Sequence, residues 1–371
     1  MTEKGCLHDW LTLHLTQGVG PGTILRLVRH FTSPRMALNA SRRELLKVPG
    51  VRQDAVDAVC RNPAYAEAEA ELKKCEGFGV SIVTWGESDY PEDLSNIHNP
   101  PPVLYVRGRR EFLRNACVGI VGARAASSYG LRTAENLAFG LGEKGYTVVS
   151  GLALGIDAAA HSGALRAKAK TIAVLGCGLD VIYPRNNRKL YERIAEEGVL
   201  VSEYPLGTSP DGFRFPARNR IISGLSLGVV VVEAAKRSGS LITADLALEQ
   251  GREVFAVPGR VDSVKSTGTH KLLKEGAKLV HSLDDVIEEL PFHRRPEARK
   301  NSLAREQKVS DIKLKPDEEK IYSYLEVYPK SIDEIVRGTM FPVQKVSEIL
   351  LLLELEGVIE ALPGKQYQLN V

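Results

Sequence analysis

The stretch that decides the fold runs from Phe213 to Gly259: FRFPARNRIISGLSLGVVVVEAAKRSGSLITADLALEQGREVFAVPG. Its valine run, Val229 to Val232, is apolar at every position, which is typical of a strand buried on both faces of a parallel sheet. A turn of small residues, Lys236 to Ser240, precedes a helix predicted from Ala244 to Glu249, and a second strand is predicted from Glu253 to Val257. A strand, a small-residue turn and a helix in this order direct backbone N–H groups and the positive end of a helix dipole at an anion.

Cations and aromatic rings gather just before the valine run. We expect a basic aromatic turn there, followed by a short amphipathic segment from Asn219 to Leu225. The turn contains Phe213, Arg214, Phe215, Arg218 and Arg220. An anion site with cations and aromatic rings beside it suggests a ligand that has both phosphates and bases.

Length and composition limit the classes of protein to consider. A chain of 371 residues exceeds one ordinary core and predicts two or three domains. A hydrophobic content of 43% and a charged content of 26% are typical of a soluble globular protein. The net charge of +3 is small, so a site for a polyanion must come from local clustering of cations.

Cysteine usage and hydropathy indicate the compartment. The 5 cysteines are scattered without a C-x-x-C pair, which argues against a zinc site or a disulfide framework and favours a reducing compartment. No apolar run approaches the ~18 residues of a membrane span. The N-terminus carries His8 and Asp9 where a signal peptide would be apolar. We therefore expect a cytoplasmic protein that does not act in a membrane.

The N-terminal segment, residues 1–80, is predicted to be a small helical domain. The glycine turns Gly18–Gly22 and Val48–Val51 each precede an amphipathic helix, and a further helix is predicted from Tyr65 to Cys75. Helix-hairpin-helix modules use such turns to offer backbone amides to DNA phosphates. Glycine and proline also simply end and begin helices in any small bundle, and we favour this second interpretation.

Residues 81–290 alternate between strand and helix patterns. This alternation predicts an α/β domain with a doubly wound parallel sheet, whose ligands lie beyond the carboxyl ends of the strands. Four small-residue loops follow predicted strands, and together they favour a phosphate-binding rim because glycine allows a close approach of the backbone to a ligand. These loops are 122–130 with Arg124 and Ser127, 150–157 with Ser150 and Gly151, 176–180, and 238–240.

The patterns of common enzymes are incomplete in this domain. The chain has no intact G-x-G-x-x-G fingerprint and no G-x-x-x-x-G-K-[ST] loop. Asp157 and His161 lie four residues apart and could form a metal or acid–base pair, but a capping aspartate and a core histidine are the commoner outcome. A triad with Ser150 lacks the G-x-S-x-G elbow. We expect no catalytic residue, no metal and no cofactor.

The tail contains a linker and a second small domain. Residues 291–315 are rich in Arg, Lys and Pro and are predicted to be a linker, whose cations either contact DNA loosely or are simply solvated. Residues 316–371 predict three helices and a hairpin, the pattern of a winged helix, with a capping box at Ser331-x-x-Glu334. The third predicted helix, Pro342 to Glu356, carries three glutamates and one lysine and would repel phosphates. We therefore expect this domain to contact protein or to regulate, and not to read duplex DNA as a transcription regulator would.

Five motifs resemble the DNA-processing protein A family (DprA, also called Smf). They are G-x-R-x-x-S-x-Y-G at 122–130, S-G-x-A-x-G-I-D-x-x-A-H at 150–161, G-x-G-x-D-x-x-Y-P at 176–184, F-P-x-R-N-R-I-x-S-G-L-S at 215–226 and S-G-S-L-I-T-A at 238–244. The resemblance is dense from about residue 85 to 285. It implies a Rossmann-like domain between a helical N-terminal domain of the SAM-like or helix-hairpin-helix kind and a C-terminal winged-helix domain.

The resemblance also implies a function and a set of contacts. A member of this family would bind single-stranded DNA during natural transformation, protect it, help to load the RecA recombinase, and form a homodimer through the Rossmann-like domain. The implied DNA-binding residues are Arg124, Ser127, Ser150, Gly151, Arg214, Phe215, Arg218, Asn219, Arg220, Ser238, Gly239, Ser240 and Thr243. The implied dimer surface contains His270, Leu272, Leu273 and Leu279, although these leucines could equally belong to the core.

One enzyme class remains as an alternative. Nucleoside-monophosphate phosphoribohydrolases of the same Rossmann class carry P-G-G-x-G-T-x-x-E, whose glutamate does the chemistry. The corresponding turn here is Ser238 to Thr243, and the position of the glutamate is Leu246. Loss of the carboxylate removes the acid–base group that ribosyl cleavage needs, so this alternative is disfavoured.

Overall fold

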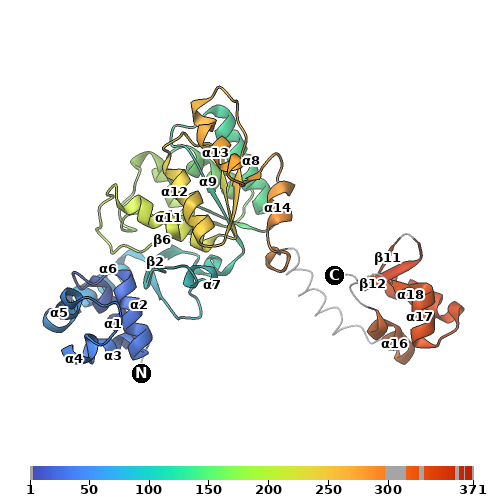
Figure 1. The fold of residues 1–371 in the computed structure, drawn as a ribbon, viewed down its shortest axis with the longest axis horizontal. Coiled ribbons are helices and arrows are strands. Elements are labelled where there is room, and N and C mark those ends of the chain that lie inside the picture. The colour runs from blue at the N-terminus through green and yellow to red at the C-terminus, as the bar shows by residue number, and fades with distance from the viewer. Residues whose placement is uncertain (1–2, 297–314, 326–329, 356–358, 363, 370–371) are drawn as a thin grey trace. The chain divides into compact units, whose positions relative to one another are not determined.

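The computed structural model describes residues 3–296, 315–325, 330–355, 359–362 and 364–369 (Figure 1). These residues form two compact units, Met1–Pro291 and Phe292–Val371, which are described separately below. Among the described residues, no helix combines the length and the apolar character that crossing a lipid bilayer requires.

A nine-stranded sheet runs through the first unit, in the order β1-β2-β6-β5-β4-β3-β7-β8-β9 within the described chain. Neighbouring strands are parallel from β6 to β9, whereas β1 and β2 pair antiparallel at one edge. The predicted doubly wound parallel sheet is therefore confirmed. The strands are β1 Ser81–Thr84, β2 Val103–Gly108, β3 Cys117–Val121, β4 Thr147–Ser150, β5 Thr171–Leu175, β6 Val199–Ser202, β7 Gly228–Val231, β8 Glu253–Ala256 and β9 Lys278–Leu279.

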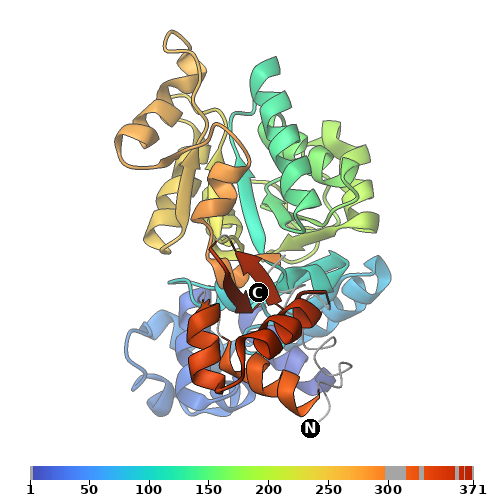
Figure 2. The same ribbon diagram turned by 90° about the vertical axis from the view of Figure 1, so that its right-hand side faces the viewer.

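Helices cover both faces of the sheet because successive strand residues point to opposite sides. In β5, Val174 packs in the same cluster as Ile221 on one face, while Leu175 packs in the same cluster as Tyr191 on the other; the helices on the two faces are seen in Figure 2. The face of Val174 is covered by α11 Arg214–Leu225, α12 Gly239–Glu249 and α13 Thr267–Lys274. The opposite face is covered by α8 Ser128–Glu143, α9 Ile156–Arg166, α10 Arg188–Glu197 and α14 Asp284–Glu289.

Six helices precede the sheet and share its core. They are α1 Glu3–Leu15, α2 Pro21–Phe31, α3 Pro34–Asn39, α4 Arg42–Leu45, α5 Gln53–Arg61 and α6 Tyr65–Phe78. Gly18 and Gly50 both have positive φ angles in the two predicted turns, and Arg26 Nη1 donates to the carbonyl of Gly50 at 3.2 Å. The hydrophobic core continues from these helices to β2 and β5, so a domain boundary at residue 80 remains a prediction.

Two helices begin earlier than the sequence pattern predicted. Helix α11 begins at Arg214, so the predicted basic aromatic turn forms the first turns of a helix. Pro216 is compatible with this position because proline is tolerated in the first turn of a helix. Helix α12 begins at Gly239 and not at Ala244, because the Ser238 side chain accepts a hydrogen bond from the Ser240 amide and caps the helix.

The second unit contains a short 3-10 helix, η4 Phe292–Arg294, and the winged-helix elements. The Ser331–Glu334 capping box is confirmed, with both reciprocal hydrogen bonds formed. Residues 297–314 of the predicted linker lie outside the described residues, as do Val327 and Glu356. The elements are α16 Pro316–Tyr324, β10 Lys330–Ser331, α17 Ile332–Thr339, α18 Val343–Leu355, β11 Ile359–Leu362 and β12 Gln366–Leu369.

Candidate nucleic-acid interface

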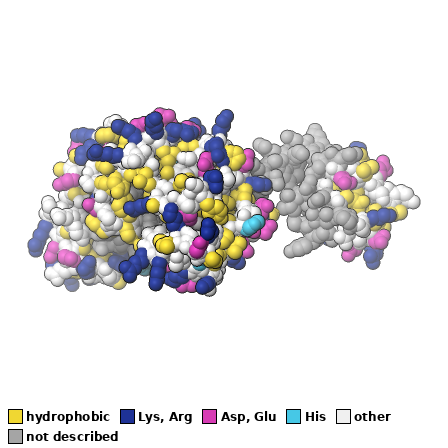
Figure 3. Space-filling model, turned by 90° about the horizontal axis from the view of Figure 1, so that it is seen from above, with side chains coloured by type: hydrophobic (Ala, Val, Ile, Leu, Met, Phe, Trp, Pro, Cys, Tyr) yellow, Lys and Arg dark blue, Asp and Glu magenta, His cyan; other side chains and the backbone are white. Residues whose placement is uncertain are grey.

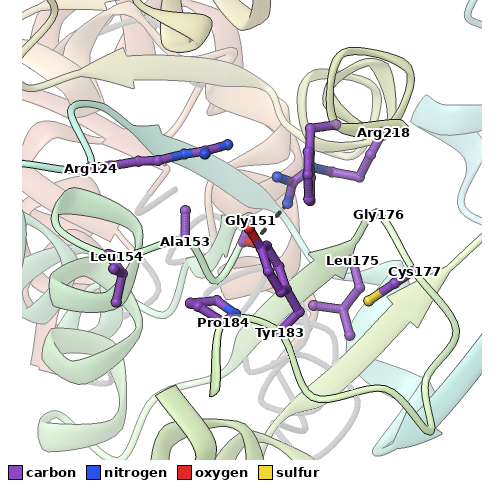
Figure 4. Close-up of a pocket in the computed structure, with 11 residues that line it drawn as sticks. Arg124, Gly151, Ala153, Leu154, Leu175, Gly176, Cys177, Tyr183, Pro184 and Arg218 are labelled. Atoms are coloured by element: carbon purple, nitrogen blue, oxygen red, sulfur yellow. Dashed lines mark hydrogen bonds between the residues drawn. The ribbon is translucent and has the colours of Figure 1, made fainter. Parts of the chain in front are cut away.

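A pocket of about 60 Å³ lies beyond the carboxyl ends of the parallel strands. Its walls come from the loops after β3, β4 and β5 and from the first turns of α11 (Figure 4). Ligands of doubly wound sheets bind at this end of the strands. The lining residues are Arg124, Gly151, Ala153, Leu154, Leu175, Gly176, Cys177, Tyr183, Pro184, Phe215 and Arg218.

Two aromatic rings form one wall of the pocket. The rings of Tyr183 and Phe215 are stacked, with centroids 5.6 Å apart and an interplanar angle of 25°. Tyr183 is 40% exposed and Phe215 is partly buried, so the pair is accessible from solvent. Phe215 can approach this closely because residue 176 is glycine; a Cβ atom there would lie only 2.9 Å from the Phe215 ring.

Arg124 supplies a cation that is available to a ligand. Its guanidinium carbon lies 5.5 Å from the centroid of the Phe215 ring, and Figure 4 shows the side chain extending across the pocket toward Arg218. Among the described carboxylates, none is paired with Arg124. An arginine next to an aromatic ring and without a carboxylate partner is suited to binding a phosphate beside a stacked base.

Arg218 has a different role because it is buried. Its side chain donates to the carbonyl oxygen of Gly151 at 2.8 Å and to that of Val174, and the residue is only 5% exposed. Burial lowers the pKa of Arg218, and the nearby Asp157 carboxylate partly opposes this shift. Burial likewise raises the pKa of Asp157, while Arg218 acts in the opposite direction. The guanidinium therefore holds the loop after β4 against the end of β5.

Arg220 and Asn219 also have partners within the protein. The Arg220 guanidinium forms a bidentate ion pair with Glu203, with N–O distances of 2.8 and 2.6 Å, and both side chains are largely buried. Asn219 is buried and donates to the carbonyl of Gly239 at 3.4 Å, which joins α11 to the start of α12. Their predicted contacts with DNA phosphates are untested, and Arg220 would have to release Glu203 to make one.

The helices α8, α9 and α12 each begin after a strand at this end of the sheet, and the backbone amides before them are not equally available. At α8, the amide and hydroxyl of Ser127 both donate to the buried Glu233 carboxylate. At α9, the Asp157 carboxylate accepts from the amides of Gly151 and Ala153. Internal carboxylates thus already accept from the amide before α8 and from two amides of the loop that leads into α9.

The start of α12 is open. Gly239 is exposed, and a Cβ atom at this position would meet no atom within 4 Å. The hydroxyls of Ser238 and Ser240 lie 2.8 Å apart, and Lys236 and Arg237 are exposed immediately before them. The face of the molecule in Figure 3 carries lysine and arginine side chains beside hydrophobic ones. An open helix N-terminus beside two exposed cations is suited to binding a phosphate.

Several other predicted residues are buried. Ser150 donates to the carbonyl of Ile120 at 2.6 Å and is fully buried, and Thr243 is only 1% exposed. His161 contacts the Thr171 hydroxyl at 2.7 Å, and burial lowers its pKa to about 3. His161 is thus a neutral core residue under ordinary conditions, whatever its spacing from Asp157. Among the described residues, no cluster of His, Cys, Asp or Glu could hold a metal ion.

The predicted dimer surface is only partly on the surface. Leu272 is 4% exposed and packs in the core beneath α13, so its assignment to a dimer surface is wrong. Leu273 is partly buried, whereas Leu279 is 52% exposed on the edge strand β9. His270 Nε2 lies 3.0 Å from the carbonyl oxygen of Gly259.

The structure adds two pocket residues, and two cations at the start of α12, to which the sequence assigned no role in binding. Tyr183 and Pro184 belong to a quoted motif but had no predicted role, and the exposed Lys236 and Arg237 were predicted only as part of a turn. Tyr183 follows β5, whereas Phe215 lies on α11 after β6. Only the fold brings these two rings together, so spacing along the chain could not have paired them.

Comparisons with known proteins agree with this architecture. The sequence profile of the DNA recombination-mediator protein A family matches residues 81–291, and that of the DprA winged helix domain matches residues 305–365. Protein Smf from Synechocystis is 36% identical over 389 residues, which cover 97% of this chain and 98% of that protein.

Two solved structures extend the likeness to three dimensions. DNA processing protein A from Streptococcus pneumoniae superposes with a TM-score of 0.70 at 38% identity, covering 77% of this chain and 99% of the other. DNA processing protein A from Helicobacter pylori, described for its single-stranded DNA binding mode, gives a TM-score of 0.52 at 34% identity. That match covers 56% of this chain and 94% of the other.

The burial of Arg218 predicts a loss of stability when its guanidinium is removed. Arg218→Met leaves two carbonyl oxygens without a donor and Asp157 without a nearby cation, which should cost about 3–5 kcal/mol of unfolding free energy. Arg124→Met is the control, since Arg124 has no carboxylate partner among the described residues. The unfolding free energies of the two variants and of the wild type are measured by urea denaturation followed by circular dichroism. A midpoint for Arg218→Met equal to that of the wild type would contradict a structural role.

Proposed function

The chain belongs to the DNA recombination-mediator protein A family, and on that premise we propose that it binds single-stranded DNA at the pocket of Arg124, Tyr183 and Phe215. The observation that carries the proposal is the stacked pair of rings, with Arg124 against one of them and no described carboxylate paired with it. A base stacks on such a ring whatever its identity, because every base has a π face.

The pocket favours single strands over duplexes for a steric reason. Bases in a duplex are already stacked and paired, and a base must leave the helix to enter a pocket between side chains. The apolar walls formed by Leu154, Leu175 and Cys177 contribute contact area without a hydrogen-bonding pattern that would select one base. Binding would therefore depend little on sequence.

The phosphates would be bound on either side of this base. Arg124 is the cation at the pocket, and the start of α12 offers the Gly239 amide between two serine hydroxyls, with Lys236 and Arg237 beside it. Asn219, on the helix that carries Phe215, connects the pocket to the start of α12 by its hydrogen bond to the carbonyl of Gly239. In this proposal Arg218, Arg220, Ser127, Ser150 and Thr243 shape the site from beneath, and Arg124 and residues 236–240 contact phosphates.

We propose a binding role without catalysis. The phosphoribohydrolase alternative needs a carboxylate at the position of Leu246 on α12. The carboxylate near the pocket, Asp157, accepts two backbone amides and is buried beside Arg218. A carboxylate engaged in this way is poorly placed to transfer a proton to a substrate.

Family membership supports a role for the protein in natural transformation. We propose that the protein acts in the cytoplasm, protects incoming single strands from nucleases and helps to load the RecA recombinase on them. For the RecA step, we expect the chain to accelerate RecA-driven strand exchange on strands coated with a single-strand-binding protein. Exchange at an unchanged rate would contradict this part of the proposal.

We further propose a homodimer formed through the α13–β9 edge of the sheet. Strand β9 is an edge strand and exposes Leu279, and unpaired edges readily pair with another chain. His270 and Leu273 lie on the adjacent helix α13 and are partly exposed.

The DNA-binding proposal predicts different effects for the pocket cation and the pocket ring. Removing one phosphate contact by Arg124→Ala should weaken binding and reduce the salt slope by about 0.7. Phe215→Ala should cost about 1–3 kcal/mol of binding free energy with the salt slope unchanged, because no charge is lost. Fluorescence anisotropy with labelled oligo(dT), repeated over a range of salt concentrations, measures both quantities.

Arg166→Ala is a matched control for this experiment. Arg166 also lies against an aromatic ring, that of Phe139, but it is at the opposite end of α9 from the pocket. The Arg166→Ala variant should therefore bind DNA with the affinity and salt slope of the wild type. Unchanged affinity for both Arg124→Ala and Phe215→Ala would place the DNA elsewhere on the protein.

The dimer proposal predicts that a charge at Leu279 separates the subunits. Leu279→Glu should give a folded monomer by light scattering with an unchanged circular dichroism spectrum, because the side chain is half exposed in the isolated chain. Met36→Glu on α3, at a similar exposure of 55%, should leave the dimer intact. A wild-type chain that is itself monomeric at high concentration would exclude this interface.

A further inference from the structure

The most exposed aromatic ring among the described residues lies just outside the pocket. Phe213 is 72% exposed and immediately precedes α11, two residues before the pocket ring of Phe215. One exposed hydrophobic residue is ordinary on a protein surface, so exposure alone assigns no role. The environment of the ring is what distinguishes it.

Phe213 is the outer layer of a stack of three planar groups. The guanidinium carbon of Arg214 lies 5.1 Å from the centroid of the Phe213 ring and 5.4 Å from that of the Tyr204 ring. Arg214 forms an ion pair with Asp211 at 2.7 Å and donates to the carbonyl of Ser209. Because Asp211 already neutralises its charge, Arg214 serves the stack chiefly as a flat support.

The loop that carries this stack is held at three points. The Leu206 amide donates to Glu71 on α6 at 2.7 Å, and the Gly207 amide donates to Asp180 at 2.7 Å. The carbonyl of Thr208 accepts from the Gly178 amide at 3.0 Å. A ring on a loop fixed in this way loses little conformational freedom when a ligand covers it, which favours binding.

We propose that Phe213 is a second base-stacking subsite, which takes the base next to the one held at Phe215. The inference rests on the proposed function and adds a second position to the same strand. The two residues lie at the start of one helix, and two residues of chain span at most about 7 Å between Cα atoms, so one flexible strand can reach both rings. The occupant is a nucleobase because a planar ring backed by a guanidinium offers a flat face, and stacking on such faces is how single strands are bound without sequence preference.

Two variants at Phe213 test the inference. Phe213→Ala should weaken oligo(dT) binding by roughly five-fold to a hundred-fold and leave the salt slope unchanged. Phe78→Ala is the matched control, since Phe78 is another exposed phenylalanine, 50% exposed at the end of α6. Phe213→Trp should lose fluorescence emission as oligo(dT) is added, at the concentration where anisotropy reports binding. The same titration of the wild type measures the background from Trp10 and Trp85.

The outcomes separate this inference from the proposed function. If the wild type and Phe78→Ala bind while Phe215→Ala is weakened, the pocket stands as the binding site. In that case, an affinity of Phe213→Ala within about two-fold of the wild type, less than any stacking contribution, overturns the second subsite. Unchanged emission from Phe213→Trp overturns it as well. A wild-type chain that does not bind oligo(dT) at all contradicts the proposed function itself.

Discussion

A buried guanidinium joins the helix that carries the pocket ring to the ends of two strands. Arg218 donates to the carbonyls of Gly151, after β4, and Val174, in β5. Glycine at residue 151 leaves room for this guanidinium, because a Cβ atom there would clash with Arg218 Nη1. With α11 held in this way, Phe215 comes to lie over Gly176 and against Tyr183, which follows β5. The stacking surface thus depends on an arginine that is itself almost fully buried.

Buried charged side chains also decide where an anion can bind. Carboxylates from the protein's own core, Glu233 and Asp157, accept from the Ser127 amide at the start of α8 and from the Gly151 amide in the loop that leads into α9. The start of α12 has no such internal carboxylate among the described residues, and Gly239 there is exposed. The glycine-rich loops that look alike in the sequence therefore differ in the structure, because two of them are filled from within.

The sheet could be predicted from the sequence because its signals are local. The valine run of β7 and the strand–helix alternation of residues 81–290 predicted the parallel sheet, whereas the antiparallel pairing of β1 and β2 at its edge was not predicted. The two-residue strand β9 has too few residues to show a period. The starts of α11 and α12 were misplaced because Pro216 and the Ser238–Ser240 segment suggest turns, whereas proline in a first turn and serine at a cap also begin helices. The pairing of Arg220 with Glu203 and the burial of Leu272 depend on contacts between distant segments, which local patterns do not contain.

The central claim is that the stacked pocket binds an unpaired base, and one comparison tests it most directly. The affinities of the full chain for a single strand and for a duplex of the same sequence are measured by anisotropy at a low and a high salt concentration. The account predicts tighter binding of the single strand at both concentrations, with a preference that persists at high salt because stacking carries little salt dependence. Equal or tighter binding of the duplex at high salt would contradict it.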